Sequence, residues 1–249
     1  MNYKIIMSRY AILSDIHGNL FALNEVINDL NNQMIDQIIL LGDLIDYGMQ
    51  SNEVVEFIKD NLSSKIICNI WGNHEKAILT RDFSHFSSKR GVDSAKFTDS
   101  ILTEESKKYL NNNLNHQGKY EFAIDDKDVL AVHGSLKDYY WKAIFPDNLN
   151  GDYSGFDIVL SGHSHYPHVF QHFYEVDNPD MRNKKAVLFI NPGSVGQPRN
   201  HNPNAQYAIL DSETMGVELK SVKYPKDEAM GLYDGSVDDF YRLRLENGI

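Results

Sequence analysis

Four short polar segments of this sequence contain residue types that ligate metal ions. They are residues 14–19 (SDIHGN), 42–46 (GDLID), 72–75 (GNHE) and 162–165 (GHSH), and His133 lies between the last two. Their side chains offer carboxylate oxygen, amide oxygen and imidazole nitrogen, a mixture that suits Mn, Fe or Zn. Two such ions held side by side are able to cleave a phosphate ester. The residue types therefore predict a two-metal hydrolytic site.

The three N-terminal segments each follow a short apolar run of strand length. These runs are residues 10–13, 38–41 and 66–70. Between them, apolar residues recur at helical spacing within 20–30 and 54–58. Alternating strands and helices predict parallel strand pairing with right-handed crossovers. Because ligands bind at the carboxyl ends of strands in such sheets, we expect the polar segments to form one composite site.

The later part of the chain changes character once and then returns to strands. Residues 80–115 are rich in Ser, Asn and Lys and have a weaker helical pattern, which indicates helices laid over the crevice as a cap-like insertion. Further strands are predicted at 120–124, 129–132, 157–160, 186–190 and 207–210, with one more at 217–222. A length of 249 residues fits a single domain over 1–249.

Composition and charge argue against several classes of protein. The formal net charge is −11 and no dense run of Lys or Arg occurs, so stable nucleic-acid binding is not expected. No apolar run approaches the roughly 18 residues of a membrane span. Cys68 is the only cysteine, and the N-terminus lacks the apolar core of a signal peptide. We therefore expect a cytoplasmic protein in which bound metal ions supply positive charge for a phosphorylated substrate.

The order of the motifs resembles that of calcineurin-like metallophosphoesterases. D-x-H, G-D-x-x-D, G-N-H-E, a separate histidine and G-H-x-H follow one another at plausible intervals, and every core position is intact between Asp15 and about Arg199. The resemblance implies an α/β fold, namely a four-layer α/β/β/α sandwich with mixed sheets and a small helical cap. It also implies a hydrolase that uses two divalent transition-metal ions, with Mn expected first and Fe or Zn as alternatives.

The resemblance also implies a role for each motif residue. The first metal ion would be bound by Asp15, His17 and His165, the second by Asn73, His133 and His163, and both by a bridging Asp43. Activated water between the two ions would then attack phosphorus. His74 would protonate the leaving group, because an acid must reach the departing oxygen without being bound to metal. Asp46 would orient His74 and fix its tautomer.

Two groups of residues near these motifs have more than one interpretation. Glu75 either supports the metal ligands or favours the start of the following helix. The histidines outside the motifs are expected to be core or surface residues; they are His85, His116, His168 and His172.

The segment 191–199 (NPGSVGQPR) resembles a loop of the small bacterial and archaeal phosphodiesterase branch of the family. Arg199 in this segment either clamps a phosphate or belongs to a purely structural turn. Tyr139 and Tyr140 either pack in the protein or offer a stacking surface for a nucleobase. In the functional interpretation, these three residues bind a nucleotide phosphodiester or a dinucleoside polyphosphate such as diadenosine tetraphosphate.

Three other functions are compatible with parts of this pattern. Serine/threonine protein phosphatases of the superfamily carry arginine after the G-D-x-x-D aspartate, whereas this chain has Tyr47. That difference disfavours a protein phosphatase, while a phosphomonoesterase stays an alternative. A non-catalytic scaffold with the same fold is expected to have lost metal ligands, and here none is missing.

Overall fold

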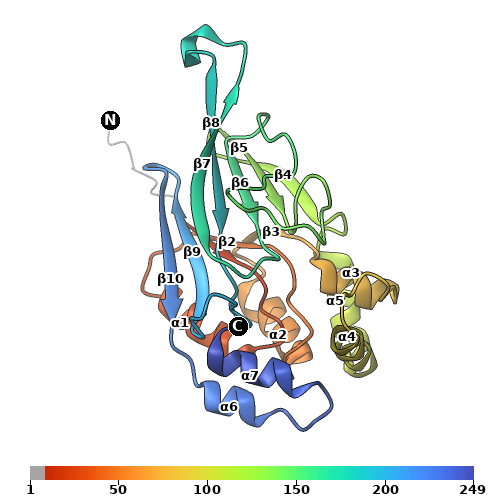
Figure 1. Cartoon of the computed structure of the whole chain (residues 1–249). Helices are drawn as coiled ribbons and strands as arrows, with labels where there is room; N and C mark the ends of the chain where they lie inside the picture. The colour runs from red at the N-terminus through yellow and green to blue at the C-terminus, as the bar shows by residue number, and fades with distance from the viewer. Residues whose placement is uncertain (1–8) are drawn as a thin grey trace.

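The computed structural model describes residues 9–249 and contains two five-stranded mixed sheets (Figure 1). The first sheet has the strand order β10-β9-β1-β2-β3. Its strands are β1 (Arg9–Leu13), β2 (Gln37–Leu40), β3 (Ile66–Asn69), β9 (Ala205–Asp211) and β10 (Gly216–Val222). Strands β1, β2 and β3 pair in parallel, and β9 pairs antiparallel with both β1 and β10.

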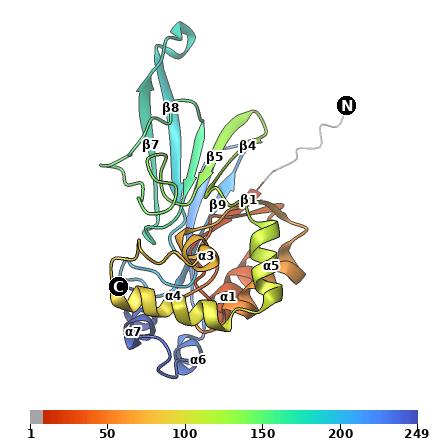
Figure 2. The same ribbon diagram turned by 90° about the vertical axis from the view of Figure 1, so that its right-hand side faces the viewer.

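The second sheet has the strand order β4-β5-β6-β8-β7. Its strands are β4 (Lys119–Ile124), β5 (Lys127–Val132), β6 (Ile158–Ser161), β7 (His168–Glu175) and β8 (Lys184–Asn191). The three central strands β5, β6 and β8 are parallel, and the edge strands β4 and β7 are antiparallel to their neighbours. The β7–β8 hairpin extends beyond the rest of the molecule in both views (Figures 1 and 2).

Helices cover the outer face of the first sheet and one end of the molecule. They are α1 (Leu20–Leu30), α2 (Ser51–Phe57), α3 (Asn73–Thr80), α4 (Lys89–Ile101), α5 (Glu104–Asn113), α6 (Lys226–Gly231) and α7 (Asp239–Asn247). A π-helical turn (Ile58–Leu62) extends α2, and a 3₁₀ turn (Pro179–Met181) lies between β7 and β8. Helices α3, α4 and α7 gather at the same end of the two sheets (Figure 2). No helix within residues 9–249 is both long and apolar enough to cross a membrane.

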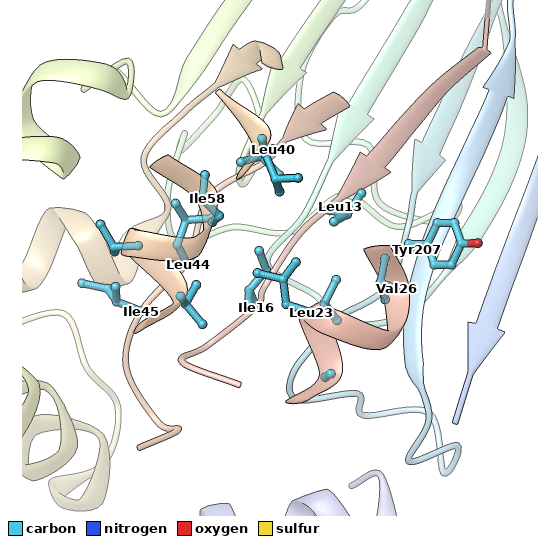
Figure 3. Close-up of a cluster of buried hydrophobic side chains, with 14 of the residues drawn as sticks. Leu13, Ile16, Leu23, Val26, Leu40, Leu44, Ile45, Ile58 and Tyr207 are labelled. Carbon is cyan, nitrogen blue, oxygen red and sulfur yellow. The ribbon is translucent and has the colours of Figure 1, made fainter. Parts of the chain in front are cut away.

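Alternating side chains of the strands divide between two faces, as the period of a β-strand requires. Ile12 and Ile39 of the first sheet pack against Leu160 and Ile190 of the second and form the core between the sheets. On the other face of the first sheet, Leu13 and Leu40 pack against Leu23 and Val26 of α1 (Figure 3). The first face holds the sheets together, and the second attaches the helical layer.

The outer face of the second sheet is covered by the segment 133–157. Ile144 and Tyr153 of this segment pack against Leu130 and Phe189, and the Tyr153 hydroxyl accepts a hydrogen bond from the Leu136 amide at 3.0 Å. The expected α/β sandwich with two mixed sheets is thereby confirmed, and its layer over the second sheet is this segment. The same segment begins at the predicted site residue His133, and its Trp141 lines the cavity described below.

The strands predicted from the sequence are all present, with ends that differ by one or two residues. Strand β7 and helices α6 and α7 were not predicted. Strand β7 lies at a sheet edge and exposes residues such as Phe173, so it lacks the apolar run that marks a buried strand. The C-terminal helices are short and rich in charged residues, and α7 also contains two aromatic residues.

Helices α4 and α5 occupy most of the segment 80–115 that we predict to be a cap-like insertion. Helix α5 packs beside α2. The Leu110 carbonyl of α5 also accepts a hydrogen bond at 2.8 Å from the indole of Trp71, which precedes α3. The part of the segment between 85 and 91 lies at the mouth of the cavity described below. The division into one domain with an insertion stays a prediction.

Gly42 follows β2 and opens the second polar segment of the site, residues 42–46, so a substitution there tests how the fold holds that segment. Its φ is +89°, and an added Cβ would lie 2.3 Å from the Gly72 amide nitrogen. We expect Gly42→Ala to lower the free energy of unfolding in urea by about 2 kcal/mol or more, through strain and overlap. The matched control Gly155→Ala meets no atom within 4 Å, so its change is expected to stay within about 0.5 kcal/mol. Equal changes in the two variants would contradict this description.

Candidate metal centre and active site

The polar motifs lie at the carboxyl ends of strands from both sheets. Asp15 follows β1, Asp43 follows β2, and Asn73 opens α3 after β3. From the second sheet, His133 follows β5 and His163 follows β6. Because the two sheets pack face to face, their strand ends bring residues separated by up to 150 positions into one buried cluster.

Left-handed backbone conformations recur at this cluster. Seven non-glycine residues of the site have positive φ: Asp15, His17, Asp43, Asp46, Tyr47, His163 and His165. Residues other than glycine adopt this region at a cost of about 1 kcal/mol or more each. These backbone conformations turn the side chains of neighbouring motif positions toward one point. The packing of the surrounding sandwich compensates for their strain.

The first ligand group converges on a point between His17, His165 and Asp15. The two Nε2 atoms lie 3.2 Å apart, and Asp15 Oδ1 lies 3.1 Å from His165 Nε2. Asp15 Oδ2 accepts hydrogen bonds from Ser14 Oγ at 2.6 Å and from the His163 amide at 3.1 Å. Asp15 Oδ1, in contrast, is buried and has no hydrogen-bond donor. Burial raises the pKa of Asp15, and a cation bound at this oxygen would remove the cost of burying its charge.

In three of the histidines, the ring nitrogen that points away from the cluster contacts a backbone carbonyl, which fixes the tautomer. The Nδ1 atoms of His17, His133 and His165 lie 3.1, 2.7 and 2.6 Å from the carbonyl oxygens of Ile45, Leu41 and Gln197. A carbonyl only accepts, so Nδ1 carries a proton in each ring, and in the neutral form of each ring the Nε2 lone pair faces the cluster. Lone pairs directed at one another fit a bound metal ion, and such carbonyl bonds orient metal-binding histidines in general.

The second ligand group shares Asp43 with the first. Asp43 Oδ2 lies 3.2 Å from His133 Nε2 and 3.7 Å from His17 Nε2. Asn73 Oδ1 lies 3.0 Å from His133 Nε2 and 2.8 Å from His163 Nδ1. One group thus contains Asp15, His17, Asp43 and His165, and the other contains Asp43, His133 and His163. The residues fit two divalent metal ions on either side of Asp43.

The carboxylate of Glu75 holds the loop that carries Asp43. Its oxygens accept hydrogen bonds from the amides of Gly72 and Asp43, both at 2.8 Å, and of Leu44 at 2.7 Å. Glu75 is also the third residue of α3, so both interpretations of this residue apply. The amide of His74 donates to Asp43 Oδ1 at 2.9 Å, which leaves Oδ2 directed at the histidines. The backbone around Asp43 is therefore fixed from both sides.

His74 is held apart from the two ligand groups by Asp46. His74 Nδ1 lies 2.6 Å from Asp46 Oδ2, and His74 Nε2 stays 4.0 Å from Asp43 Oδ2. Asp46 Oδ1 accepts hydrogen bonds from Ser94 Oγ at 2.6 Å and Thr98 Oγ1 at 2.9 Å, both on α4. Burial lowers the pKa of His74, but the carboxylates of Asp43 and Asp46 outweigh it and hold this pKa above its ordinary value.

The electrostatics of the other histidines differ between positions. Burial lowers the pKa of His17 and His165 well below the ordinary value, and burial together with His133 lowers that of His163 to about 4. These rings are neutral at physiological pH, as a metal ligand must be. At His133 burial opposes protonation, but the Asp43 carboxylate raises the pKa to about 9.

A cavity of about 420 Å³ opens onto the cluster. Its lining includes five of the predicted site residues, namely Asp43, Asn73, His74, His163 and His165. Aromatic rings line its walls, namely Tyr47, Phe86, Trp141, Phe240 and Tyr241, and so do the guanidinium groups of Arg90, Arg199 and Arg244. The cavity therefore combines a metal-binding floor with cationic and aromatic walls, in a chain whose net charge is −11.

The candidate substrate-binding residues lie in different places. Arg199 lines the cavity, whereas Tyr139 and Tyr140 do not. Tyr140 donates its hydroxyl hydrogen to the His116 carbonyl, and the Tyr139 ring lies beneath the ammonium of Lys119. The aromatic residue of this stretch that faces the cavity is the neighbouring Trp141.

Several residues that line or support the site were given no role in the sequence analysis. His85, expected to be a core or surface residue, is exposed and lines the cavity mouth, with its ring 5.5 Å from that of Trp141. Ser94 and Thr98 stand four residues apart, the spacing of one helix face, but nothing in their sequence points to Asp46. Tyr241 and Arg244 share a face of α7 and lie far in sequence from every motif.

Comparison with known proteins agrees with this geometry. The calcineurin-like phosphoesterase superfamily domain matches residues 9–215. An uncharacterized protein of Methanocaldococcus jannaschii is 34% identical over 227 residues, which cover 88% of this chain and 89% of that protein.

Two solved structures share the fold over nearly the whole chain. A metallophosphoesterase from Sphaerobacter thermophilus has a TM-score of 0.75 at 25% identity and covers 98% of this chain and 100% of its own. A hypothetical protein from Pyrococcus horikoshii has a TM-score of 0.76 at 22% identity, with 98% and 99% covered. From the match to the family domain and the intact motifs in its site, the chain belongs to the calcineurin-like phosphoesterase superfamily.

Proposed function

We propose that this protein is a two-metal phosphodiesterase that hydrolyses nucleotide-type substrates, including dinucleoside polyphosphates such as diadenosine tetraphosphate. One observation carries the proposal. Two buried ligand groups share Asp43 at the floor of a cavity that also contains the His74–Asp46 pair. Metal-assisted hydrolysis of a phosphate ester needs both parts, a place for adjacent cations and a separate proton donor.

The two ligand groups would hold Mn, or alternatively Fe or Zn. The first ion belongs with Asp15, His17 and His165, the second with Asn73, His133 and His163, and Asp43 serves both. When bound, the ions supply a nucleophilic water at neutral pH and positive charge for the phosphoryl oxygens. Mixed oxygen and imidazole ligands accept several of these metals, so the availability of each metal in the cell decides which one binds.

His74 is the general acid in this proposal. Its Nδ1 is occupied by Asp46, so its Nε2 is the atom that protonates the leaving oxygen. The raised pKa favours the protonated ring that this role requires. Asp46 is a positioning residue, because Ser94 and Thr98 hold its second oxygen and thereby fix the imidazole ring.

The walls of the cavity support a nucleotide-type substrate. Aromatic rings offer stacking surfaces for a base, and Trp141 replaces Tyr139 and Tyr140 in this role. Arg199 is placed to bind a phosphate group. The Tyr47 ring is buried between two other rings. Its centre lies 4.2 Å from that of Tyr241 and 4.4 Å from that of His74. This position therefore offers an aromatic ring where the protein phosphatases have a cation.

A panel of substrates with added Mn²⁺ tests the proposal. We expect hydrolysis of bis-p-nitrophenyl phosphate and diadenosine tetraphosphate, with turnover of p-nitrophenyl phosphate lower. Products of the second substrate identify the bond that breaks, since AMP plus ATP indicates asymmetric cleavage and two ADP symmetric cleavage. Hydrolysis of monoesters alone would replace the proposal by a phosphomonoesterase. No hydrolysis of any phosphoester would favour a non-catalytic scaffold.

Replacement of His74 tests the general acid. We expect His74→Asn to lower kcat for a dinucleoside monophosphate by about 10²–10⁴-fold, because its alkoxide leaving group needs a proton. Bis-p-nitrophenyl phosphate has a better leaving group and should lose less. The metal content by elemental analysis should equal that of wild type, and the exposed His172→Asn is the matched control. Wild-type turnover of the dinucleoside substrate by His74→Asn would rule out this role.

Metal binding is expected to release a proton from His133. In the metal-free protein the pKa of His133 is raised to about 9, chiefly by Asp43 against the effect of burial, so its ring is protonated at neutral pH. An ion in the second group must displace that proton, so the apparent affinity for Mn²⁺ should rise about tenfold between about pH 6.5 and about pH 7.5. Calorimetry in buffers of different ionisation enthalpy counts the released protons. An affinity independent of pH would contradict the assignment.

A further inference from the structure

Two arginine side chains at the wall of the cavity have no acidic partner. Arg244 of α7 is only 8% exposed, and Arg199 lies beside it in the lining of the same cavity. The Nε atoms of both are buried without a hydrogen-bond acceptor. Among residues 9–249, no Asp or Glu oxygen lies within ion-pair distance of either guanidinium. Buried charges in proteins are normally paired, so this arrangement is unusual.

The contacts that Arg244 does make balance its charge only in part. Its guanidinium lies 4.5 Å from the ring centre of Phe240 and 5.8 Å from that of Tyr241. Such cation–π contacts contribute far less than a carboxylate partner. Burial, and then the positive charge of Arg199, lower the pKa of Arg244 to about 10. Arg244 is still protonated at neutral pH, and with Arg199 it forms a pair of arginines at the wall of the cavity.

The neighbouring Arg242, on the same helix, differs from Arg244 because it has an acidic partner. Its guanidinium donates to both carboxylate oxygens of Asp239, at 2.5 and 3.0 Å. Asp239 therefore serves the outward face of α7, while Arg244 on the inward face faces the cavity with its hydrogen-bonding capacity unused. A paired surface arginine needs no ligand, and an unpaired buried one lining a cavity fits an anion.

We propose that Arg199 and Arg244 form a subsite for a second phosphate group of the substrate, one that is bound but not cleaved. The inference rests on the proposed function, since it assumes that the metal groups on the cavity floor hold the scissile phosphate. Guanidinium groups bind phosphate oxygens through paired N–H donors, which suits a phosphate chain better than a neutral ester arm. The substrate class is then a nucleotide with at least two linked phosphates rather than a simple diester.

Helix α7 supplies Arg244, one of the two residues of this subsite, from outside the part of the chain that matches the family domain, whereas Arg199 lies inside it. That match ends at residue 215, whereas Arg244, Phe240 and Tyr241 all follow it. The metal groups are built from residues before that point. In this proposal the C-terminal helix adds to the choice of substrate, whereas the cleavage chemistry comes from the shared domain alone.

Two substrates that differ by one phosphate test the subsite. The p-nitrophenyl esters of AMP and of ADP have the same nucleoside and the same leaving group, but only the ADP ester carries an additional phosphate. We expect Arg244→Gln to raise KM for the ADP ester by about tenfold or more, because the variant loses a charge-assisted hydrogen bond to the additional phosphate. KM for the AMP ester should stay within about twofold, and kcat should be unchanged for both, since the lost contact is not to the reacting phosphate.

The control is Arg242→Gln, which removes a positive charge two residues away on the same helix. It should leave both KM values unchanged, because Arg242 is paired with Asp239 outside the cavity. An equal loss for the two esters in Arg244→Gln, or the same loss in Arg242→Gln, would overturn the subsite and leave a general charge effect.

Binding to the metal-free protein separates the subsite from catalysis. We expect inorganic pyrophosphate to bind metal-free wild-type protein in calorimetry, with Arg244→Gln weakening this binding by at least about tenfold. Undiminished binding by the variant would overturn the subsite. If wild type instead binds pyrophosphate but hydrolyses neither ester with Mn²⁺, the proposed function fails while the subsite stands.

Stability separates binding from a structural role of Arg244. Replacement by methionine keeps packing against Phe240 but removes a buried, unpaired charge, so Arg244→Met is expected to unfold at the same or a higher urea concentration than wild type. It should show the same loss of pyrophosphate binding as Arg244→Gln. A variant that unfolds at lower urea and still binds pyrophosphate would show that Arg244 is structural.

Discussion

Asp43 places one carboxylate at the junction of two ligand groups, 3.7 Å from His17 Nε2 on one side and 3.2 Å from His133 Nε2 on the other. A buried carboxylate in this position is costly unless positive charge surrounds it. Much of the local structure follows from that requirement. The neighbouring histidines, His133 first, outweigh burial and hold the pKa of Asp43 well below its ordinary value.

The backbone around Asp43 is equally constrained. An added Cβ at Gly72 would lie 2.1 Å from Asp43 Oδ1, so glycine is required there for reasons of space alone. The Glu75 carboxylate accepts hydrogen bonds from the amides of this loop, and Asp43 itself has a φ of 54°. Such strain is tolerated because the inter-sheet core fixes the strand ends on which the loops stand. A stable sandwich and a strained site are therefore parts of one arrangement.

The motifs and the strands that carry them could be predicted from the sequence because both are local. An apolar run followed by Gly-Asp or Gly-Asn specifies a strand end and the side chain placed there. The contribution of α7 could not be predicted, since Arg244 reaches the cavity only through packing of the C-terminal segment. The same applies to Trp141, because residues 139–141 lie in an irregular segment where side-chain direction has no period. Ser94 and Thr98 meet Asp46 through tertiary packing of α4, which no local pattern encodes.

The floor and the wall of the cavity differ in the charge of the groups that they suit. Carboxylates and neutral imidazoles on the floor suit cations, whereas the arginines of the upper wall suit anions, in a protein that is acidic overall. The claim on which everything else rests is that two metal ions share Asp43. Anomalous diffraction from crystals grown with Mn²⁺ tests it most directly. The account predicts two peaks about 3.5–4 Å apart, one on each side of the Asp43 carboxylate. A single peak, or two peaks that do not share Asp43, would contradict it.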